Sequence, residues 1–293
     1  MNKKRLLPLF LALAMFLSTA CVDKIPEPLV SKTPPPVTDT PPIREEYPVY
    51  FDDELFEAAP ETVASLSPMV TEMLYDLGLG GYLVGVSDYC DRPGEKIGSP
   101  AKPDIDALTA LAPELLITSS PIAATDILKL EQAGIRVLKV TIPNNYADLY
   151  SLYIKFSLIF TGMTTGTELA NDVLKPLDDA LIAAQRLGVS TEYVIVEAET
   201  DGGLMLSPSD TLCSDILSVF GTNIYTGDSY VVTDDELYYI APKTVFYASG
   251  VDKDYVKKTF PHAQLIEIDF AAFERPSLAV MEVVSVCAGE IEK

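Results

Sequence analysis

Two series of short apolar runs, separated by one long amphipathic stretch, constrain the fold of this chain most strongly. In each series the apolar runs alternate with stretches of helical periodicity. Runs without polar alternation are typical of strands that are covered on both faces, as in parallel sheets. The sequence therefore predicts an α/β protein in which largely parallel sheets are covered by helices.

The predicted elements fall into two Rossmann-like α/β lobes of similar size. The expected strands are Thr62–Leu66, Leu83–Val86, Leu115–Thr118 and Val137–Val140 in lobe one, and Tyr193–Glu197, Val245–Ala248 and Leu265–Ile268 in lobe two. The expected helices are Met69–Leu77, Ile105–Ala112, Asp126–Ala133, Asp210–Phe220, Asp234–Ile240, Tyr255–Phe260 and Leu278–Ile291. Residues typical of helix ends support these helices: Ser67 before Pro68, Asp104, the capping-box pair Thr233 and Glu236, and the glycines Gly78 and Gly134.

One long amphipathic stretch, Thr165–Leu187, lies between the two lobes. Its large aliphatic residues recur along one stripe, which predicts a helix. Pro176 lies inside this range and is expected to kink the helix or to split it in two. We therefore predict an N-terminal lobe at 46–164, a single linking helix at 165–187 that forms a stiff hinge, and a C-terminal lobe at 188–293.

The first 45 residues are predicted to lie outside the folded lobes. Residues 1–20 combine a positive start with the apolar run Leu6–Leu17, which is too short for a comfortable membrane span. Small residues then precede Cys21, a pattern that resembles the signal and lipidation site of a bacterial lipoprotein; a plain secretory signal is the alternative. Residues 21–45 are rich in proline and predict an extended tether, with a disordered tail as the alternative. We expect an extracytoplasmic protein, anchored to the cell membrane by a lipid on Cys21.

The chain is strongly acidic, with 43 Asp and Glu residues against 21 Lys and Arg residues. This balance argues against a nucleic-acid partner, because phosphates need a basic surface. It also argues against electrostatic docking on anionic lipid. Cys90, Cys213 and Cys287 follow the signal segment, and their odd number leaves at least one thiol unpaired. A Cys213–Cys287 bridge stays open.

Four segments directly follow predicted strands, where the ligands of open parallel sheets gather. In lobe one they are the segment "SDYC", which contains Tyr89, and Ser119-Ser120-Pro121. In lobe two they are Ala198–Met205 and Asp269–Phe273. We expect these four segments to be loops that face each other across a ligand cleft between the lobes.

Several sequence blocks follow one another in order through both lobes. Lobe one contains "SLSPMVTEMLYDLG" (Ser65–Gly78), "VGVSDYCDRP" (Val84–Pro93) and "IDALTALAPELLI" (Ile105–Ile117). Lobe two contains "SPSDTLCSDILSVFGTNI" (Ser207–Ile224), "LYYIAPKTVFY" (Leu237–Tyr247) and "FERPS" (Phe273–Ser277). From about Pro48 to its end, the chain resembles the iron-complex and cobalamin class of substrate-binding proteins, and most of all the cobalamin-binding member. The resemblance implies two lobes joined by a helical backbone.

The resemblance also implies a function and partners. Such proteins capture a metal chelate outside the membrane and deliver it to an ABC permease driven by an ATPase, and one acidic residue on each lobe meets arginines of the permease. Glu274 matches the lobe-two position, whereas Asp106 at the lobe-one position is one methylene shorter than the usual Glu. Taken alone, Asp106 is a helix-start carboxylate and Glu274 a solvated residue beside Arg275. We expect a monomer with no resident cofactor or metal.

A large flat ligand needs aromatic and apolar walls with few oriented polar groups. Tyr89 is the strongest single candidate for such a contact, with simple packing as the alternative. Cys90 is expected to pack as a small hydrophobe. This chain contains no Trp, although the cobalamin-binding member offers tryptophans to its ligand. The remaining candidate ligand contacts are Ser119, Ser120, Met205, Tyr230, Phe270 and Phe273. Of these, Tyr230, Phe270 and Phe273 could replace the missing tryptophans.

The basic residues, metal ligands and nucleophiles of the sequence narrow the range of possible ligands and functions further. Arg92 and Lys102 are the basic residues near lobe-one strand ends, which favours a bulky, near-neutral chelate such as cobalamin; a ferric siderophore or heme is the alternative. The chain has one histidine, His262, expected in a surface loop, and zinc or manganese capture needs several. Cys90 and His262 belong to different lobes, so no catalytic pair and no enzyme is expected. A structural or adhesive cell-surface lipoprotein is the alternative of another class.

Overall fold

The computed structural model describes residues 46–227 and 231–291. The predictions for the signal segment, the tether, Cys21 and Tyr230 lie outside the described residues. Within the described ranges, no helix combines the length and the apolar composition that a membrane crossing requires. The two lobes belong to one compact unit, Arg44–Lys293.

The sheet of lobe one has five strands in the order β5-β4-β3-β8-β9, and all of its pairings are parallel. The strands are β3 (Val63–Ser65), β4 (Leu83–Val86), β5 (Glu95–Lys96), β8 (Leu115–Thr118) and β9 (Arg136–Lys139). The strands predicted for this lobe are confirmed, and β5 adds a short edge. Because β4, β3 and β8 are neighbours, the residues that follow them meet at one edge of the sheet.

The sheet of lobe two is mixed. Its parallel strands are β10 (Thr191–Thr200), β12 (Gly221–Asn223), β14 (Thr244–Ala248) and β15 (Gln264–Ile268), and β11 (Gly203–Leu206) and β13 (Val231–Thr233) add antiparallel pairings. The prediction of a loop at Ala198–Met205 is wrong, because β10 continues to Thr200 and returns as β11. Asp201 and Gly202 lie between the two strands, and an Asp-Gly pair is typical of a hairpin turn. The strand therefore reverses instead of ending.

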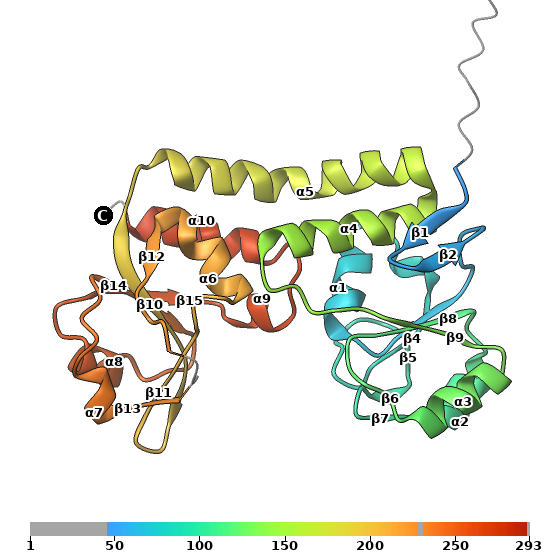
Figure 1. Cartoon of the computed structure of the whole chain (residues 1–293), viewed down its shortest axis with the longest axis horizontal. Helices are drawn as coiled ribbons and strands as arrows, with labels where there is room; N and C mark the ends of the chain where they lie inside the picture. The colour runs from blue at the N-terminus through green and yellow to red at the C-terminus, as the bar shows by residue number, and fades with distance from the viewer. Residues whose placement is uncertain (1–45, 228–230, 292–293) are drawn as a thin grey trace, which may run out of the picture. The chain divides into compact units, whose positions relative to one another are not determined.

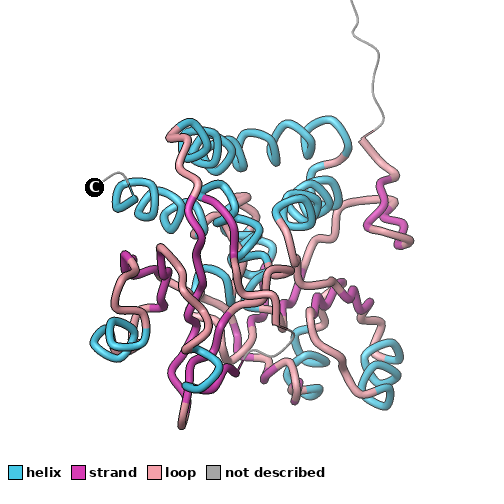
Figure 2. Tube along the Cα trace, turned by 60° about the vertical axis from the view of Figure 1, so that its left-hand side comes forward, coloured by secondary structure: helices cyan, strands magenta, loops and turns pink. Residues whose placement is uncertain are grey.

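Shorter helices cover the two sheets (Figures 1 and 2). They are α1 (Pro68–Asp76), α2 (Ile105–Leu111), α3 (Ala124–Gln132), α6 (Leu212–Leu217), α7 (Asp234–Leu237), α8 (Lys253–Thr259), α9 (Ala271–Glu274) and α10 (Val280–Ile291). The α/β class is thereby confirmed. The predicted caps are also present: Ser67 accepts a hydrogen bond from the N–H of Val70 and Asp104 from that of Ala107, and Thr233 and Glu236 form a capping box. Helix α9 begins at Ala271, so the loop expected at Asp269–Phe273 is confined to its first two residues.

Helix α5 (Met163–Arg186) connects the two lobes along the chain (Figure 1). Pro176 lies inside this one helix, so of the two expected outcomes, a kink or a split, the split does not occur. The start of α5 is held by Glu46, whose carboxylate accepts a hydrogen bond from the backbone N–H of Thr164 at 2.8 Å. The segment that precedes β1 is therefore fixed to the N-terminal end of the linking helix. The domain boundaries at 164 and 187 stay a prediction.

A second long helix, α4 (Tyr146–Thr161), packs against α5 and has no counterpart among the sequence predictions. The hairpin of β1 (Val49–Phe51) and β2 (Glu54–Phe56) packs on α4, where the rings of Phe51 and Phe156 lie 5.2 Å apart. The buried residues of α4 are Leu149, Leu152, Tyr153, Phe156, Ser157, Ile159 and Phe160. Because α4 is covered on several sides, its apolar residues do not form one stripe.

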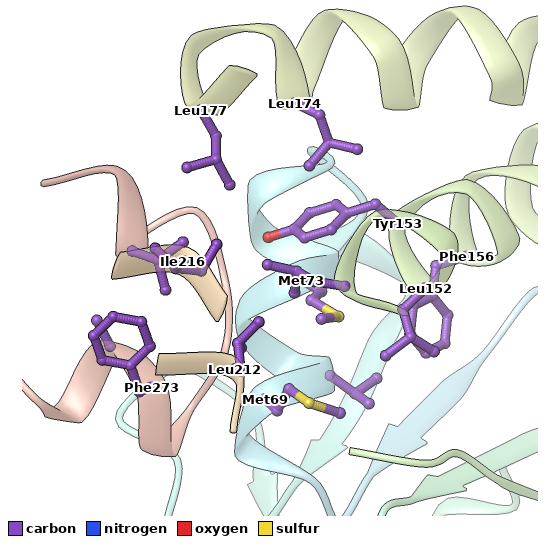
Figure 3. Packing of buried hydrophobic residues seen from close by; sticks show 14 of the residues in the cluster. Met69, Met73, Leu152, Tyr153, Phe156, Leu174, Leu177, Leu212, Ile216 and Phe273 are labelled. Atoms are coloured by element: carbon purple, nitrogen blue, oxygen red, sulfur yellow. The ribbon is translucent and has the colours of Figure 1, made fainter. Parts of the chain in front are cut away.

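One hydrophobic cluster extends through both lobes and the long helices (Figure 3). It joins Met69 of α1 in lobe one to Leu212 of α6 in lobe two, with Leu174 of α5 and Tyr153 of α4 beside them. Separate clusters fill the other face of each sheet. The lobes therefore share a core near the hinge, which makes large changes in their relative angle costly.

Candidate functional site

Serine hydroxyls gather at the carboxyl edge of the lobe-one sheet. Ser67, Ser87 and Ser119 follow β3, β4 and β8 respectively. The Ser119 hydroxyl donates a hydrogen bond to the Ser67 hydroxyl at 2.8 Å. Ser87 is fully buried, and its hydroxyl accepts a hydrogen bond from the backbone N–H of Tyr89 at 3.3 Å. This edge therefore presents fixed hydroxyl groups.

The turn that carries Tyr89 is fixed on its inner side. The Lys96 ammonium donates to the carbonyl oxygens of Ser87, at 3.2 Å, and of Cys90. The Cys90 sulfur lies 3.4 Å from the Thr71 hydroxyl and only 4% of the residue is exposed. Burial raises the pKa of the Cys90 thiol, which agrees with the predicted packing role. Tyr89 itself is 60% exposed. A fixed backbone thus presents an aromatic ring to solvent.

Arg92 fixes the outer side of the same turn. Its guanidinium donates to both carboxylate oxygens of Glu72 on α1, with a shortest distance of 2.6 Å. It also lies over the ring of Tyr75, 4.6 Å from the ring centre. A bidentate guanidinium pair has a defined geometry, and the cation–π contact adds to it. Arg92 is therefore a positioning group for the Tyr89 turn and is not free to bind an anion.

Tyr89 and Ser119 lie on the wall of a cavity of about 250 Å³ that both lobes form. Glu274 and Arg275 of lobe two face them there. Ile142, which is 52% exposed, adds an apolar contact. Ser67, Pro68 and Met69 complete the lining. The structure therefore brings together Tyr89, Ser119 and Glu274 from the predicted set, and it adds Arg275 and Ile142.

Charged groups of both lobes meet at this cavity. Arg275 approaches the Asp91 carboxylate of lobe one to 3.4 Å, and the Asp91 side chain is 94% exposed. Exposed pairs of this kind contribute about 0–1 kcal/mol to stability. Behind Glu274, Glu197 accepts a hydrogen bond from Ser207. Burial raises the pKa of Glu197, the Ser207 hydrogen bond opposes this rise, and the charge of Glu274 adds to it. The positive charge of Arg275 is therefore balanced by nearby carboxylates.

Comparison with known proteins decides the family. Residues 63–249 match the family model described as "Periplasmic binding protein", which is more than half of the chain. This chain belongs to the periplasmic binding protein family. The resemblance found in the sequence blocks is thereby confirmed at the level of the family. Periplasmic binding proteins bind ligands and are not enzymes.

A curated relative and two solved structures are similar over most of the chain. The "Uncharacterized ABC transporter substrate-binding lipoprotein YvrC" of Bacillus subtilis is 27% identical over 236 residues, which is 73% of each protein. The periplasmic vitamin B12 binding protein BtuF of Vibrio cholerae superposes with a TM-score of 0.64 at 19% identity, over 80% of this chain and 97% of its own. The periplasmic heme binding protein HutB of Vibrio cholerae gives 0.66 at 17% identity, over 79% and 99%. At such identities the two structures show a shared fold.

The other candidate ligand contacts of this periplasmic binding protein do not line the 250 Å³ cavity. Ser120 exchanges hydrogen bonds with the Thr118 hydroxyl. Met205 is half-buried on β11, and Phe270 is half-buried with its ring 5.8 Å from that of Phe273. Phe273 is only 9% exposed and belongs to the central hydrophobic cluster (Figure 3). The short helix α9 turns this side chain toward the core, which the sequence did not indicate. Roles of these residues in binding stay predictions.

The two candidate docking residues are both exposed. Asp106 lies in the first turn of α2, where a carboxylate is stabilised by the helix dipole. Glu274 ends α9 beside Arg275 on the cavity wall. Glu274 therefore stands at the mouth of the cleft, where either a ligand or a docked protein can reach it.

Cys90 and His262, the one Cys–His combination weighed in the sequence analysis, do not meet in the structure. Cys90 is buried in lobe one, whereas His262 is exposed on lobe two and lines a different cavity. The two side chains lack the hydrogen-bond contact that an activated thiol needs. Among the described residues, no three His, Cys, Asp or Glu side chains are grouped so as to hold a metal ion. The cleft offers an aromatic ring, hydroxyls, a carboxylate and a guanidinium, and all of these groups can contact a bound ligand.

Proposed function

We propose that this periplasmic binding protein is the substrate-binding component of an ABC importer and captures a metal chelate outside the membrane. The observation that carries the proposal is the exposed ring of Tyr89, held on a turn fixed by Lys96 and Arg92. It lines the same cavity as Arg275 of the other lobe. A rigid aromatic face with few oriented polar groups suits a bulky conjugated ligand. The family and the name of the Bacillus subtilis relative support a role in import.

A bulky chelate must widen the cleft before it binds. A cavity of about 250 Å³ is smaller than the ~300–1,000 Å³ typical of sites for drug-sized ligands. Across the cleft, the contact of Asp91 with Arg275 would have to break. Breaking an exposed pair costs about 1 kcal/mol or less, so the loss of this contact adds little to the free energy of opening. The shared core at the hinge limits its extent.

The charges of the cleft favour a corrinoid among the possible chelates. Glu72 engages Arg92, and Lys102 lines a different cavity, beside Asp88 and Asp106. Arg275 therefore provides the cleft with its cation, and Glu274 and Asp91 balance it. A near-neutral ligand such as cobalamin fits this balance better than a polyanionic ferric siderophore. Heme is the second candidate, because one guanidinium can hold a carboxylate of its periphery.

Equilibrium dialysis of residues 44–293 against cyanocobalamin, hemin and a ferric catecholate siderophore tests the proposal. Each ligand is followed by its own visible absorbance at micromolar concentration. We expect one cyanocobalamin to be retained per protein, with weaker retention of the other two. Preferential retention of hemin or the siderophore would reassign the ligand. Retention of none by protein that unfolds cooperatively would reject chelate capture.

Delivery requires a position at the membrane and a surface for the permease. We propose that Cys21 carries a lipid, a role supported by the signal pattern and by the lipoprotein name of the relative. We also propose that Asp106 and Glu274 meet the permease, which works with its ATPase. A Cys21→Ser variant should move the protein from the membrane fraction to the soluble fraction. Unchanged fractionation would reject the anchor.

A further inference from the structure

A second cavity, of about 700 Å³, opens in lobe two away from the cleft. It lies between the segment that joins α7 to β14 and the turn that joins α8 to β15. Both segments precede strands, whereas the cleft residues follow strands. The two cavities have no lining residue in common. In Figure 1, α7 and α8 lie on the side of lobe two that faces away from lobe one. This cavity is therefore separate from the proposed chelate site.

The floor of the second cavity is apolar and its rim is aromatic. Leu237 and Phe260 are 2% and 3% exposed and belong to the outer hydrophobic cluster of lobe two. Tyr238 on the rim is 84% exposed, and its ring packs edge-on against the equally exposed Tyr239 at 5.4 Å. The volume lies within the range of ~300–1,000 Å³ that is typical of small-molecule sites. The cavity can thus accept an apolar or aromatic group.

The same cavity gathers positive charge in an otherwise acidic chain. The chain carries a formal charge of −22, yet residues 240–262 contain Lys243, Lys253, Lys257 and Lys258 against only Asp252 and Asp254. Lys243, Lys258 and His262 line the cavity.

Not all of these basic side chains are engaged by protein groups. Lys257 donates to the carbonyl oxygen of Ala263 at 3.2 Å and so fixes the turn after α8. Lys243 makes an exposed pair with Glu192 at 3.2 Å. For Lys258 and His262, the part of the chain that the structure describes provides no hydrogen-bond or ion-pair partner. Their donors are free to meet an anion at the mouth of the cavity.

We propose that this cavity binds a small amphiphilic anion. An aromatic or aliphatic body would lie on Leu237 and Phe260 beside Tyr238, and a carboxylate, sulfonate or phosphate group would meet Lys258 and His262. A charge-assisted hydrogen bond from the Lys258 ammonium and a hydrogen bond from the His262 imidazole fix the anionic end, and burial of the apolar body provides the remaining affinity. The site is independent of the chelate cleft, so the failure of one proposal does not affect the other.

The single histidine makes this proposal directly testable. His262 is the only histidine of the chain, so in tag-free protein its imidazole C–H signals in the proton NMR spectrum need no assignment. Residues 44–293 are titrated with 8-anilino-1-naphthalenesulfonate, whose rings and sulfonate match the two halves of the site. We expect saturable displacement of the His262 signals and one bound dye per protein. Unmoved signals at saturating dye would overturn the proposal.

Matched variants separate this site from other dye-binding surfaces. Lys258→Ala should weaken dye binding by about tenfold, the effect of losing one charge-assisted contact. Lys253→Ala, at the other end of α8, and Tyr89→Ala, in the cleft, should leave the affinity unchanged. N-phenyl-1-naphthylamine, which lacks the sulfonate, should bind at least about tenfold more weakly. Equal affinity for the uncharged dye, or loss of binding only in Tyr89→Ala, would contradict an anion site at Lys258.

Discussion

The Asp76 carboxylate at the end of α1 accepts a hydrogen bond from the backbone N–H of Leu278, ahead of α10, at 3.0 Å. The same oxygen accepts the phenolic proton of Tyr153 on α4 at 2.5 Å. One carboxylate therefore joins lobe one, the long helix α4 and lobe two at the hinge. Burial raises the pKa of Asp76, and the hydrogen bonds from Tyr153 and Leu278 oppose that rise.

The raised pKa of Asp76 predicts how stability depends on pH. The pKa of Asp76 in the folded state lies above its unfolded value of 3.8. The contribution of Asp76 to the free energy of unfolding is therefore full below pH 3.8 and is lost as the pH rises through the folded-state pKa. Asp76→Asn should therefore show a shallower fall in the free energy of unfolding from pH 3.8 to neutral than the parent. Tyr153→Phe should shift the fall to higher pH, because it removes a hydrogen bond that favours the carboxylate. Urea unfolding at a series of pH values measures this, and identical slopes in all three proteins would contradict the role of Asp76.

Arg92 is predicted to affect ligand affinity without touching the ligand. Arg92→Ala should weaken chelate binding about threefold to tenfold, because the Tyr89 turn loses its bidentate anchor on Glu72. Arg92→Lys should not restore affinity, since an ammonium cannot reproduce the planar fork or its contact with Tyr75.

Arg136 supplies a matched control for Arg92. It pairs with Glu54 and lies 4.1 Å from the ring centre of Phe56, the same chemistry outside the cleft. Arg136→Ala should change the melting temperature to a similar extent and leave chelate affinity unchanged. If both variants bind the chelate as the parent does, the turn is not positioned by Arg92.

More of the fold than of the site could be predicted, because burial leaves a regular pattern of apolar residues in the sequence. Strands β4 and β8 were predicted to the residue, since both are apolar runs bounded by polar residues. Helix α4 could not be predicted, because a helix buried on several sides loses the single apolar stripe on which the prediction relies. The β10–β11 hairpin is signalled only by Asp201 and Gly202 within an acidic stretch.

The site depends on contacts between residues far apart in sequence. Tyr89 was a candidate because it follows a predicted strand, where ligands of parallel sheets gather, and because a large flat ligand needs aromatic walls. Arg275 was not a candidate, because no local pattern reveals that α9 brings it opposite Asp91. The same short helix turns Phe273 into the core, so Phe273 and Arg275 lie in different environments although they are two residues apart. Such distinctions need tertiary structure.

The docking proposal predicts separate effects on uptake and on binding. Glu274→Gln and Asp106→Asn should each lower chelate uptake by cells, because neutral side chains lose their attraction to permease arginines. Asp106→Asn should bind the chelate within about twofold of the parent, because Asp106 lies outside the cleft cavity. Asp106→Glu should retain uptake, and Glu131→Gln on the exposed side of α3 serves as the control. Normal uptake by the double variant would reject docking through these two residues.

The three cysteines of the described chain are predicted to be inert in the folded protein. Cys90, Cys213 and Cys287 are free and at most 4% exposed, and burial raises the pKa of each thiol, that of Cys287 to about 12. A disulfide-exchange reagent at pH 8 should react slowly with native residues 44–293. In guanidinium chloride it should react readily, with three thiols per chain. A count of one thiol in unreduced, denatured protein would instead reveal a disulfide, and a Cys90→Ser variant with no free thiol would identify it as Cys213–Cys287.

The most direct test of the central claim is the affinity for cyanocobalamin of the parent protein, Tyr89→Ala and Tyr238→Ala, measured side by side by equilibrium dialysis. Both tyrosines are exposed, but only Tyr89 lies in the cleft. We predict one bound ligand per parent protein, affinity at least about tenfold weaker in Tyr89→Ala with an unchanged melting curve, and parental affinity in Tyr238→Ala. No retention by the folded parent protein, or equal affinity in Tyr89→Ala, would contradict a corrinoid site at this turn.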